Sequence, residues 1–177
     1  VTSIGERAFD GCDGLTSVII GNSVVSIGVE AFYDCDVLAS VTIGNNVASI
    51  GNGAFYGCRK LDSVIIPNSV TSIGDEAFFY CNGLTSVTIG NNVASIGSNA
   101  FAGCKSLISI IIPSSVISIR EGTFSDCKGL KSVTIGDNVT SIGAKAFYNC
   151  IGLTSVTIPN SVVSISDSVF EGCVGLS

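Results

Sequence analysis

The sequence predicts a repeat solenoid, that is, a stack of similar coils wound around one axis. The main observation is self-similarity, because the stretch of residues 61–83 recurs along the whole chain with a step of 23 residues. Phenylalanine marks this step from Phe9 to Phe170, and a cysteine follows three residues later in every copy. A coil of this length buries its apolar side chains only by stacking on its neighbours. Residues 1–177 are therefore expected to form a single domain of about 7.7 coils.

Each coil contains one alternating segment that predicts a β-strand. In the first copy, Val18 and Ile20 are expected to face inward, while Ser17 and Ile19 face outward. Stacking these segments in register gives a parallel sheet along one side of the solenoid. A turn follows each strand, and Pro67-Asn68-Ser69 is a representative example.

The remainder of each coil is expected to return to the next strand in two steps. A short extended piece of the form Val-x-Ser-Ile-Gly comes first. The following stretch, such as residues 75–81, carries Ala, Phe and Cys at spacings of one and three, which predicts a single helical or 3₁₀ turn on the opposite side. Acidic residues at its start in several copies are typical of a helix N-terminus.

A second period of 46 residues is superimposed on the first. Pro67, Pro113 and Pro159 are separated by this step, and glycine occupies the same position in the coils between them. The second outward position of the strand follows the same rhythm, since isoleucine and threonine alternate from one coil to the next. Thr157 breaks this alternation, and Gly21 stands where proline would be expected. The outward surface of the sheet is therefore expected to repeat at every second coil.

The recurring string Leu-x-x-Val-x-Ile-Pro-x-Ser-Val-x-x-Ile-Gly-x-x-Ala-Phe-x-x-Cys resembles the BspA-like leucine-rich repeats over the whole chain. The resemblance implies a right-handed leucine-rich-repeat solenoid with the parallel sheet on its concave side. It also implies an extracellular or cell-surface protein that adheres to matrix proteins or to other cells, without catalytic residues or a cofactor. The departures from the string are local: Arg120 and Ser166 replace glycine, and Thr123 and Val169 replace alanine.

The outward strand positions are the candidate ligand-binding residues, because they form a ribbon of serine, threonine and isoleucine with little charge. Exposed isoleucine also follows from β-propensity alone, so this alternative stays open. The copy that begins at Leu107 carries the most apolar bulk, and Lys131 lies in the next coil. The candidates are Ser17, Ile19, Ser40, Thr42, Ser63, Ile65, Ser86, Thr88, Ile108, Ser109, Ile111, Lys131 and Thr134.

Other polar and reactive residues have simpler explanations. One cysteine per coil at an identical position predicts a column of buried free thiols, and a zinc site is not expected because the chain has no histidine. Without histidine, a serine or cysteine nucleophile lacks its commonest base, so an enzyme is not expected. The asparagine column that includes Asn22 and Asn68 is expected to bond to the backbone of the next coil. Asn138 begins the one glycosylation sequon and is a candidate modification site.

Charge and hydropathy narrow the range of partners. The net charge is −6 and the eight Lys and Arg residues occur without a basic stripe, which disfavours nucleic-acid binding. No apolar run is long enough for direct membrane insertion by this segment. Both ends fall inside a repeat, and the first and last copies lack the atypical sequence of a cap, so the segment is expected to belong to a longer array or to stack end to end with other copies.

The sequence therefore favours a non-enzymatic extracellular binding scaffold that recognises a protein or cell-surface ligand through its concave face. The alternative is a structural protein whose copies associate end to end into a filament.

Overall fold

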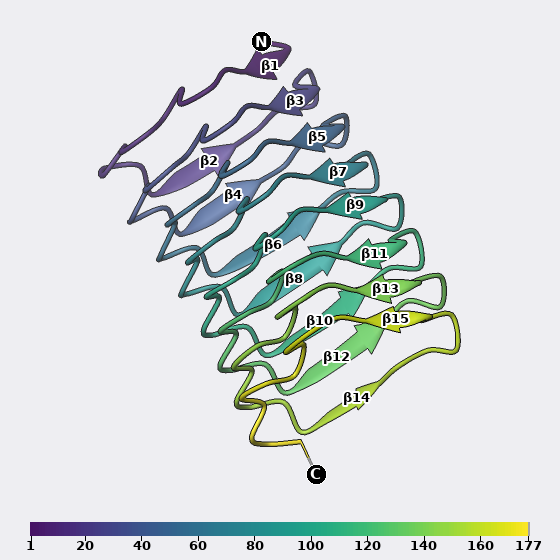
Figure 1. The fold of residues 1–177 in the computed structure, drawn as a ribbon. Helices are drawn as coiled ribbons and strands as arrows, with labels where there is room; N and C mark the ends of the chain where they lie inside the picture. Colours follow the sequence, from purple (N-terminus) through teal and green to yellow (C-terminus); the bar gives the residue numbers. More distant parts are fainter. Residues whose placement is uncertain (177) are drawn as a thin grey trace.

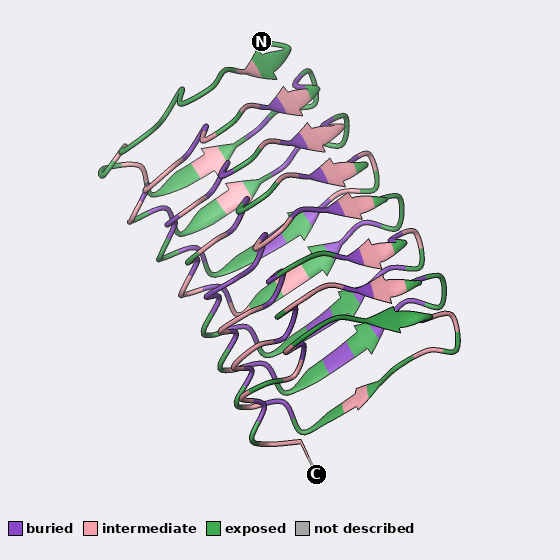
Figure 2. Cartoon of the chain, viewed as in Figure 1, coloured by how far each residue is buried: buried purple, intermediate pink, exposed green. Residues whose placement is uncertain are grey.

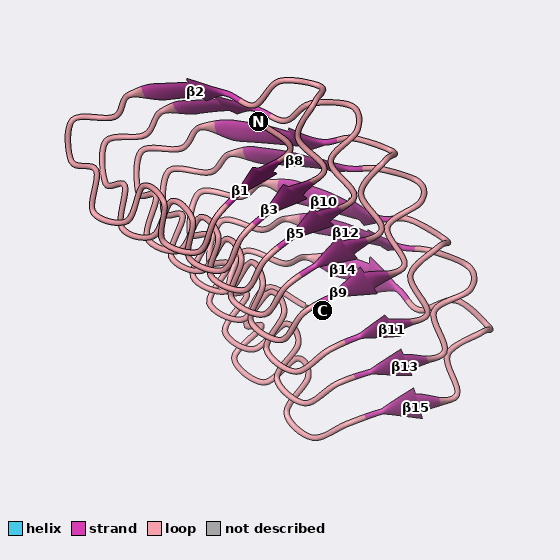
Figure 3. Cartoon of the chain, turned by 90° about the horizontal axis from the view of Figure 1, so that it is seen from above, coloured by secondary structure: helices cyan, strands magenta, loops and turns pink. Residues whose placement is uncertain are grey.

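The computed structural model describes residues 1–176 and confirms the repeat solenoid (Figure 1). Each coil supplies one strand to a broad sheet and a shorter strand to a narrow sheet, and the two sheets lie on different sides of the stack (Figure 3). All strand pairs are parallel. Their register confirms the step of 23 residues, since Ser63 pairs with Ser86 and Ile66 pairs with Ile89.

The strands alternate between the two sheets along the chain. The broad sheet contains β2 (Ser17–Ile19), β4 (Ser40–Thr42), β6 (Ser63–Ile66), β8 (Ser86–Ile89), β10 (Ser109–Ile112), β12 (Ser132–Ile135) and β14 (Ser155–Thr157). The narrow side contains β1 (Ser3–Ile4), β3 (Ser26–Ile27), β5 (Ser49–Ile50), β7 (Ser72–Ile73), β9 (Ser95–Ile96), β11 (Ser118–Ile119), β13 (Ser141–Ile142) and β15 (Ser164–Ile165).

Burial follows the alternation that the sequence predicts (Figure 2). In β6, Val64 and Ile66 are buried, whereas Ser63 and Ile65 are exposed. In the narrow strands from β3 to β13 the serine is less buried than the isoleucine, as in Ser72 and Ile73 of β7, whereas both residues of β15 are exposed. The expected inward and outward faces are therefore confirmed.

The core consists of columns of identical side chains, of which the phenylalanine column is the most regular. From Phe9 to Phe170 the rings of successive coils stack with centroids 5.0 to 5.6 Å apart and with interplanar angles of 1 to 9°. The six rings between them are fully buried. Parallel rings at this separation have the offset stacking that aromatic pairs prefer. One residue of slippage between coils would break every such contact at once.

The expected helical or 3₁₀ turn is wrong, because the described residues contain no helix of either kind. Residues 75–81 instead form successive tight turns whose alternate N–H groups bond to the next coil. The N–H groups of Glu76 and Phe78 donate to the carbonyls of Ser98 and Ala100, at 2.9 and 2.7 Å. A helix would direct these donors back along its own axis, so the contact between coils replaces helical bonding.

The tight turns place two residues of each coil at a positive φ angle. Glycine fills six of these positions, and Glu76 and Tyr80 both have φ of 56°. The first column is Arg7, Glu30, Gly53, Glu76, Asn99, Gly122, Lys145 and Ser168, and the second is Gly11, Asp34, Gly57, Tyr80, Gly103, Asp126, Asn149 and Gly172.

The narrow side is interrupted between β9 and β11, which do not pair, so it divides into sheets of five and three strands. Elsewhere the residue after the narrow strand donates to the previous coil: Gly97 N–H bonds to Ile73 O at 2.9 Å, and Gly143 N–H bonds to Ile119 O at 2.8 Å. No corresponding bond from Arg120 is present within residues 1–176.

The interruption has a steric cause. A Cβ atom added at Gly51 would lie 2.6 Å from the Gly28 carbonyl carbon, and one at Gly143 would lie 2.7 Å from the Glu121 nitrogen. Glycine permits this close approach, although Ser166 at the same position in the last coil still donates its N–H to Ile142 O at 2.9 Å. We attribute the missing pairing of β9 with β11 to the bulk of the Arg120 side chain, because the smaller side chain of Ser166 does not prevent the pairing of β13 with β15.

Arg120→Gly is expected to restore pairing between β9 and β11. Each regained backbone hydrogen bond contributes about 0.5–1.5 kcal/mol and the glycine costs about 0.5–1 kcal/mol, so the free energy of unfolding should rise by about 1 kcal/mol. Urea unfolding measures the change in stability. Hydrogen exchange at the Ile117 amide measures the pairing, because the equivalent amides of Ala94 and Thr140 donate to the previous coil. Gly74→Arg, placed in an uninterrupted part of the sheet, should lower stability. An unprotected Ile117 amide in the glycine variant would contradict the steric explanation.

The positive φ angle of Glu76 gives a second prediction. Asparagine tolerates the left-handed region, whereas a β-branched side chain does not. Glu76→Val should therefore lower the free energy of unfolding by about 1–2 kcal/mol, and Glu76→Asn should leave it unchanged or raise it. Urea unfolding of both variants decides the point, and equal stability would show that the turn tolerates a valine.

Candidate binding surface

The outward face of the broad sheet brings the predicted binding residues together in two columns. One column contains serine in every coil, and all its members from Ser17 to Ser155 are exposed. In the other, Ile19, Ile65 and Ile111 are 83%, 69% and 67% exposed. The residues of this column in the intervening coils are Thr42, Thr88 and Thr134, which are also exposed. Bulky isoleucine and smaller, hydroxyl-bearing threonine therefore alternate along the axis from β2 to β12, and Thr157 in β14 breaks the alternation.

Two further candidates lie at the entrance to the broad strands. Ile108 is 51% exposed, and the Lys131 N–H donates to the Ile108 carbonyl at 2.8 Å, which holds the two side by side in adjacent coils. Ile108 and Ile111 both belong to the coil of β10. This coil therefore presents the most apolar surface on the face, as the sequence predicts.

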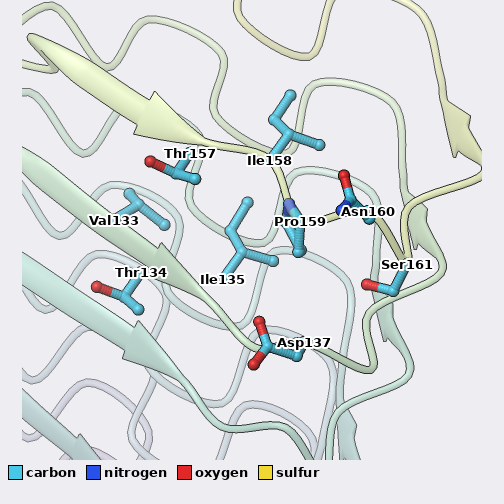
Figure 4. A pocket seen from close by; sticks show the side chains of 9 residues that line it. All are labelled: Val133, Thr134, Ile135, Asp137, Thr157, Ile158, Pro159, Asn160 and Ser161. Atoms are coloured by element: carbon cyan, nitrogen blue, oxygen red, sulfur yellow. The ribbon is translucent and has the colours of Figure 1, made fainter.

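Hollows lie where the broad strands end, and sequence reasoning did not predict them. One of about 580 Å³ lies between Thr134, Asp137, Thr157, Pro159 and neighbouring residues (Figure 4). In Figure 4 the two threonines lie side by side at one end of the hollow, and Pro159 and Asn160 close the other.

A second hollow of about 520 Å³ is lined by Ile65, Pro67, Thr88 and Asn91, among others. Both hollows therefore adjoin a proline coil and the Ile/Thr column. The step of 46 residues between prolines was the signal that could have located them.

The asparagine column is structural, as the sequence predicts. The side-chain carbonyls of Asn22 and Asn68 accept the backbone N–H groups of Asn45 and Asn91, in both cases at 2.8 Å. Asn138 lies in the adjacent column, is exposed, and donates its Nδ2 to the Ser114 carbonyl at 2.9 Å. The sequon asparagine therefore holds two coils together, and its glycosylation stays a prediction.

The cysteines are free, and all except Cys12 are buried. From the second coil onward, each thiol donates to the phenylalanine carbonyl of the previous coil, with S···O distances of 3.0 to 3.3 Å. Burial raises the pKa of Cys104 and Cys127 well above the ordinary value. It raises the pKa of Cys150 to about 12. These thiols therefore stay protonated and unreactive at neutral pH.

Electrostatic contacts are few among the described residues. Two exposed ion pairs are formed, Arg7 with Glu30 and Arg59 with Asp36. Neither lies on the outward face of the broad sheet. Within residues 1–176 no group of three or more His, Cys, Asp or Glu side chains is placed to hold a metal ion, and no helix is suited to crossing a membrane.

Comparison with known proteins agrees with this geometry. A family model described as the BspA type leucine-rich repeat region matches residues 1–107 and 48–177. No curated protein sequence matches the chain.

Solved structures show the same fold. A leucine-rich repeat protein of T. pallidum is 32% identical with a TM-score of 0.81, and the match covers 86% of this chain and 72% of that one. A leucine-rich repeat protein from Bacteroides ovatus is 30% identical with a TM-score of 0.66, and the match covers 100% of this chain and 58% of that one. The pneumococcal vaccine antigen PcpA, 18% identical with a TM-score of 0.52, shares the fold over 92% of this chain and 57% of its own.

The buried thiols predict that the protein is sensitive to alkali. Below a pH of about 8.5, the ordinary cysteine pKa, both folded and unfolded chains carry neutral thiols and the stabilisation is complete. Above it the unfolded chain ionises first because the folded pKa values are raised. Stability should then fall by up to about 1.4 kcal/mol per pH unit for each buried thiol.

Urea unfolding between pH 7.5 and about 10.5 measures this slope. Cys104→Ala should be less stable at neutral pH, because it leaves a cavity, yet its slope should be shallower by about one proton. An unfolding free energy that is independent of pH would contradict the buried-thiol explanation.

Proposed function

Because the chain belongs to the BspA-type leucine-rich repeat family, we propose that it is a binding module which presents the outward face of its broad sheet to a protein ligand. The observation that carries the proposal is the exposure of Ile19, Ile65 and Ile111 in one column, with no ion pair on the same face. Exposed apolar side chains gathered on one face are typical of a contact site.

The shape of the face supports the same proposal. Isoleucine and threonine alternate, so ridges and shallower places follow one another along the axis. The hollows beside Pro67 and Pro159 extend this relief to the edge of the sheet. A ligand that crosses several coils would contact equivalent groups at every second coil, at intervals of about 9.6 Å. Affinity would then be the sum of several modest contacts.

The chemistry of the face favours binding over catalysis. The chain has no histidine, and its buried cysteines have raised pKa values. Serine and threonine hydroxyls on the sheet therefore lack an adjacent base. We infer that the module is non-enzymatic, that its ligand is a protein or a cell-surface structure, and that it acts outside the cell.

End-to-end assembly into a filament is the alternative. It has no separate support, because any two neighbouring coils of the stack would present the same apolar surface if they were parted. The outward isoleucines, by contrast, remain exposed within an intact stack. This difference favours the outward face of the broad sheet as the functional surface.

Replacing Ile65, Ile108 and Ile111 together by lysine tests the proposal. Binding to a panel of immobilised extracellular-matrix proteins should weaken by about tenfold or more, because each isoleucine buries apolar area worth about 1.5 kcal/mol or more. Surface plasmon resonance measures the affinity, and circular dichroism checks that the fold is retained.

Ile117→Lys is the matched control, because Ile117 is 52% exposed but precedes the narrow strand β11. Its affinity should equal that of the unmodified chain. The proposal fails if the triple variant binds as tightly as the control, or if the unmodified chain binds only through residues outside the broad sheet.

A further inference from the structure

The charges of this chain are distributed unevenly along the solenoid axis. Residues 1–46 contain six acidic residues and one basic residue, whereas residues 100–145 contain five basic residues and three acidic ones. The order of the coils in space follows the order of the sequence (Figure 1). One part of the stack is therefore acidic, and the part about four coils further along is basic.

The separation is sharpest in the column directly after the cysteines. This column lies on the edge of the stack where each coil leads into its broad strand. Its members in the first six coils are Asp13, Asp36, Arg59, Asn82, Lys105 and Lys128. All four charges at its two ends are solvent-accessible, and Lys131 adds another exposed positive charge beside the basic end.

Most of these charges have no partner within the chain. Asp36 forms an exposed pair with Arg59 at 3.4 Å, but Asp13, Lys105 and Lys128 form no ion pair within residues 1–176. The edge therefore resembles a linear dipole whose two ends are free to interact with another molecule.

We propose that two copies of the chain associate side by side and antiparallel through this edge. In that arrangement Asp13 of one copy faces Lys128 of the other, and Asp36 faces Lys105. Both pairs have the same midpoint in the column, halfway between Arg59 and Asn82. Because successive coils stack at similar separations, with phenylalanine ring centroids 5.0 to 5.6 Å apart, one two-fold axis at that point brings all four pairs into register.

The second copy is the occupant that fits the whole edge. A uniformly acidic or basic ligand would pair with one half of the column and repel the other. Parallel side-by-side packing would place like charges opposite each other. Antiparallel packing alone matches every charged end with its opposite, and it leaves the outward isoleucines of the broad sheet accessible.

The dimer is weak and sensitive to salt, because exposed ion pairs contribute little individually and each copy carries a net charge of −6, so the two copies repel each other overall. Sedimentation equilibrium of the full chain should give a dimer mass at low ionic strength. The dissociation constant should rise by about tenfold or more between about 0.02 and 0.5 M salt, as the Debye length falls.

Charge reversal distinguishes this edge from other contacts. Lys105→Glu with Lys128→Glu should give monomers, and so should Asp13→Lys with Asp36→Lys. The variant that combines all four changes reverses the dipole and should dimerise again. The off-edge control Lys145→Glu with Asp167→Lys should behave as the unmodified chain does.

Three results would overturn the inference. The unmodified chain could be monomeric at every salt concentration, or the fourfold variant could stay monomeric. The third is a mass that grows without limit as concentration rises, which would indicate end-to-end assembly in place of a closed dimer.

Discussion

Hydrogen bonding between successive coils is the interaction on which the rest of this structure depends. The backbone N–H of Phe32 donates to Ala54 O at 2.8 Å in the next coil, and the Cys58 thiol donates back to Phe32 O at 3.2 Å. A coil removed from its neighbours would leave these groups unsatisfied in an apolar setting, which is costly. The registration that these bonds impose also aligns the phenylalanine rings. Polar and apolar contributions therefore favour the same stacking.

The period of two coils has its own physical origin in the turn after the broad strand. A Cβ atom at Gly90 would lie 2.6 Å from the Pro67 carbonyl oxygen, so the glycine that follows a proline coil permits close stacking at this turn. The side chain that bonds back to the previous coil also differs between glycine coils and proline coils. Asn92 Nδ2 reaches back to Asn68 O at 2.9 Å, whereas Ser115 Oγ reaches back to Val93 O at 2.6 Å. The outward Ile/Thr alternation therefore shares its period with a packing requirement of the turns.

The sequence was sufficient to predict the columns but not the path of the backbone between them. Alternation in residues 17–20 determines which side chains face inward. The spacing of Ala, Phe and Cys is compatible with a helical turn and with successive tight turns alike. Gly53 and Gly57 at the positive-φ positions of their coil were the available signal against a helix. The interruption at Arg120 depends on an approach of coils within van der Waals distance, which a repeat pattern does not reveal.

The candidate surface could be predicted in composition but not in relief, since the hollows beside Pro67 and Pro159 arise from the turn geometry. This fold constrains the residue type at some positions of each coil and leaves it free at others. Core positions hold one residue type in coil after coil, because each must match its neighbour above and below. The edge column accepts Asp, Arg, Asn and Lys at the same backbone position, so stacking does not determine its order. The change from acidic to basic along this column is therefore not a requirement of stacking, and the proposed contact between two copies would account for it.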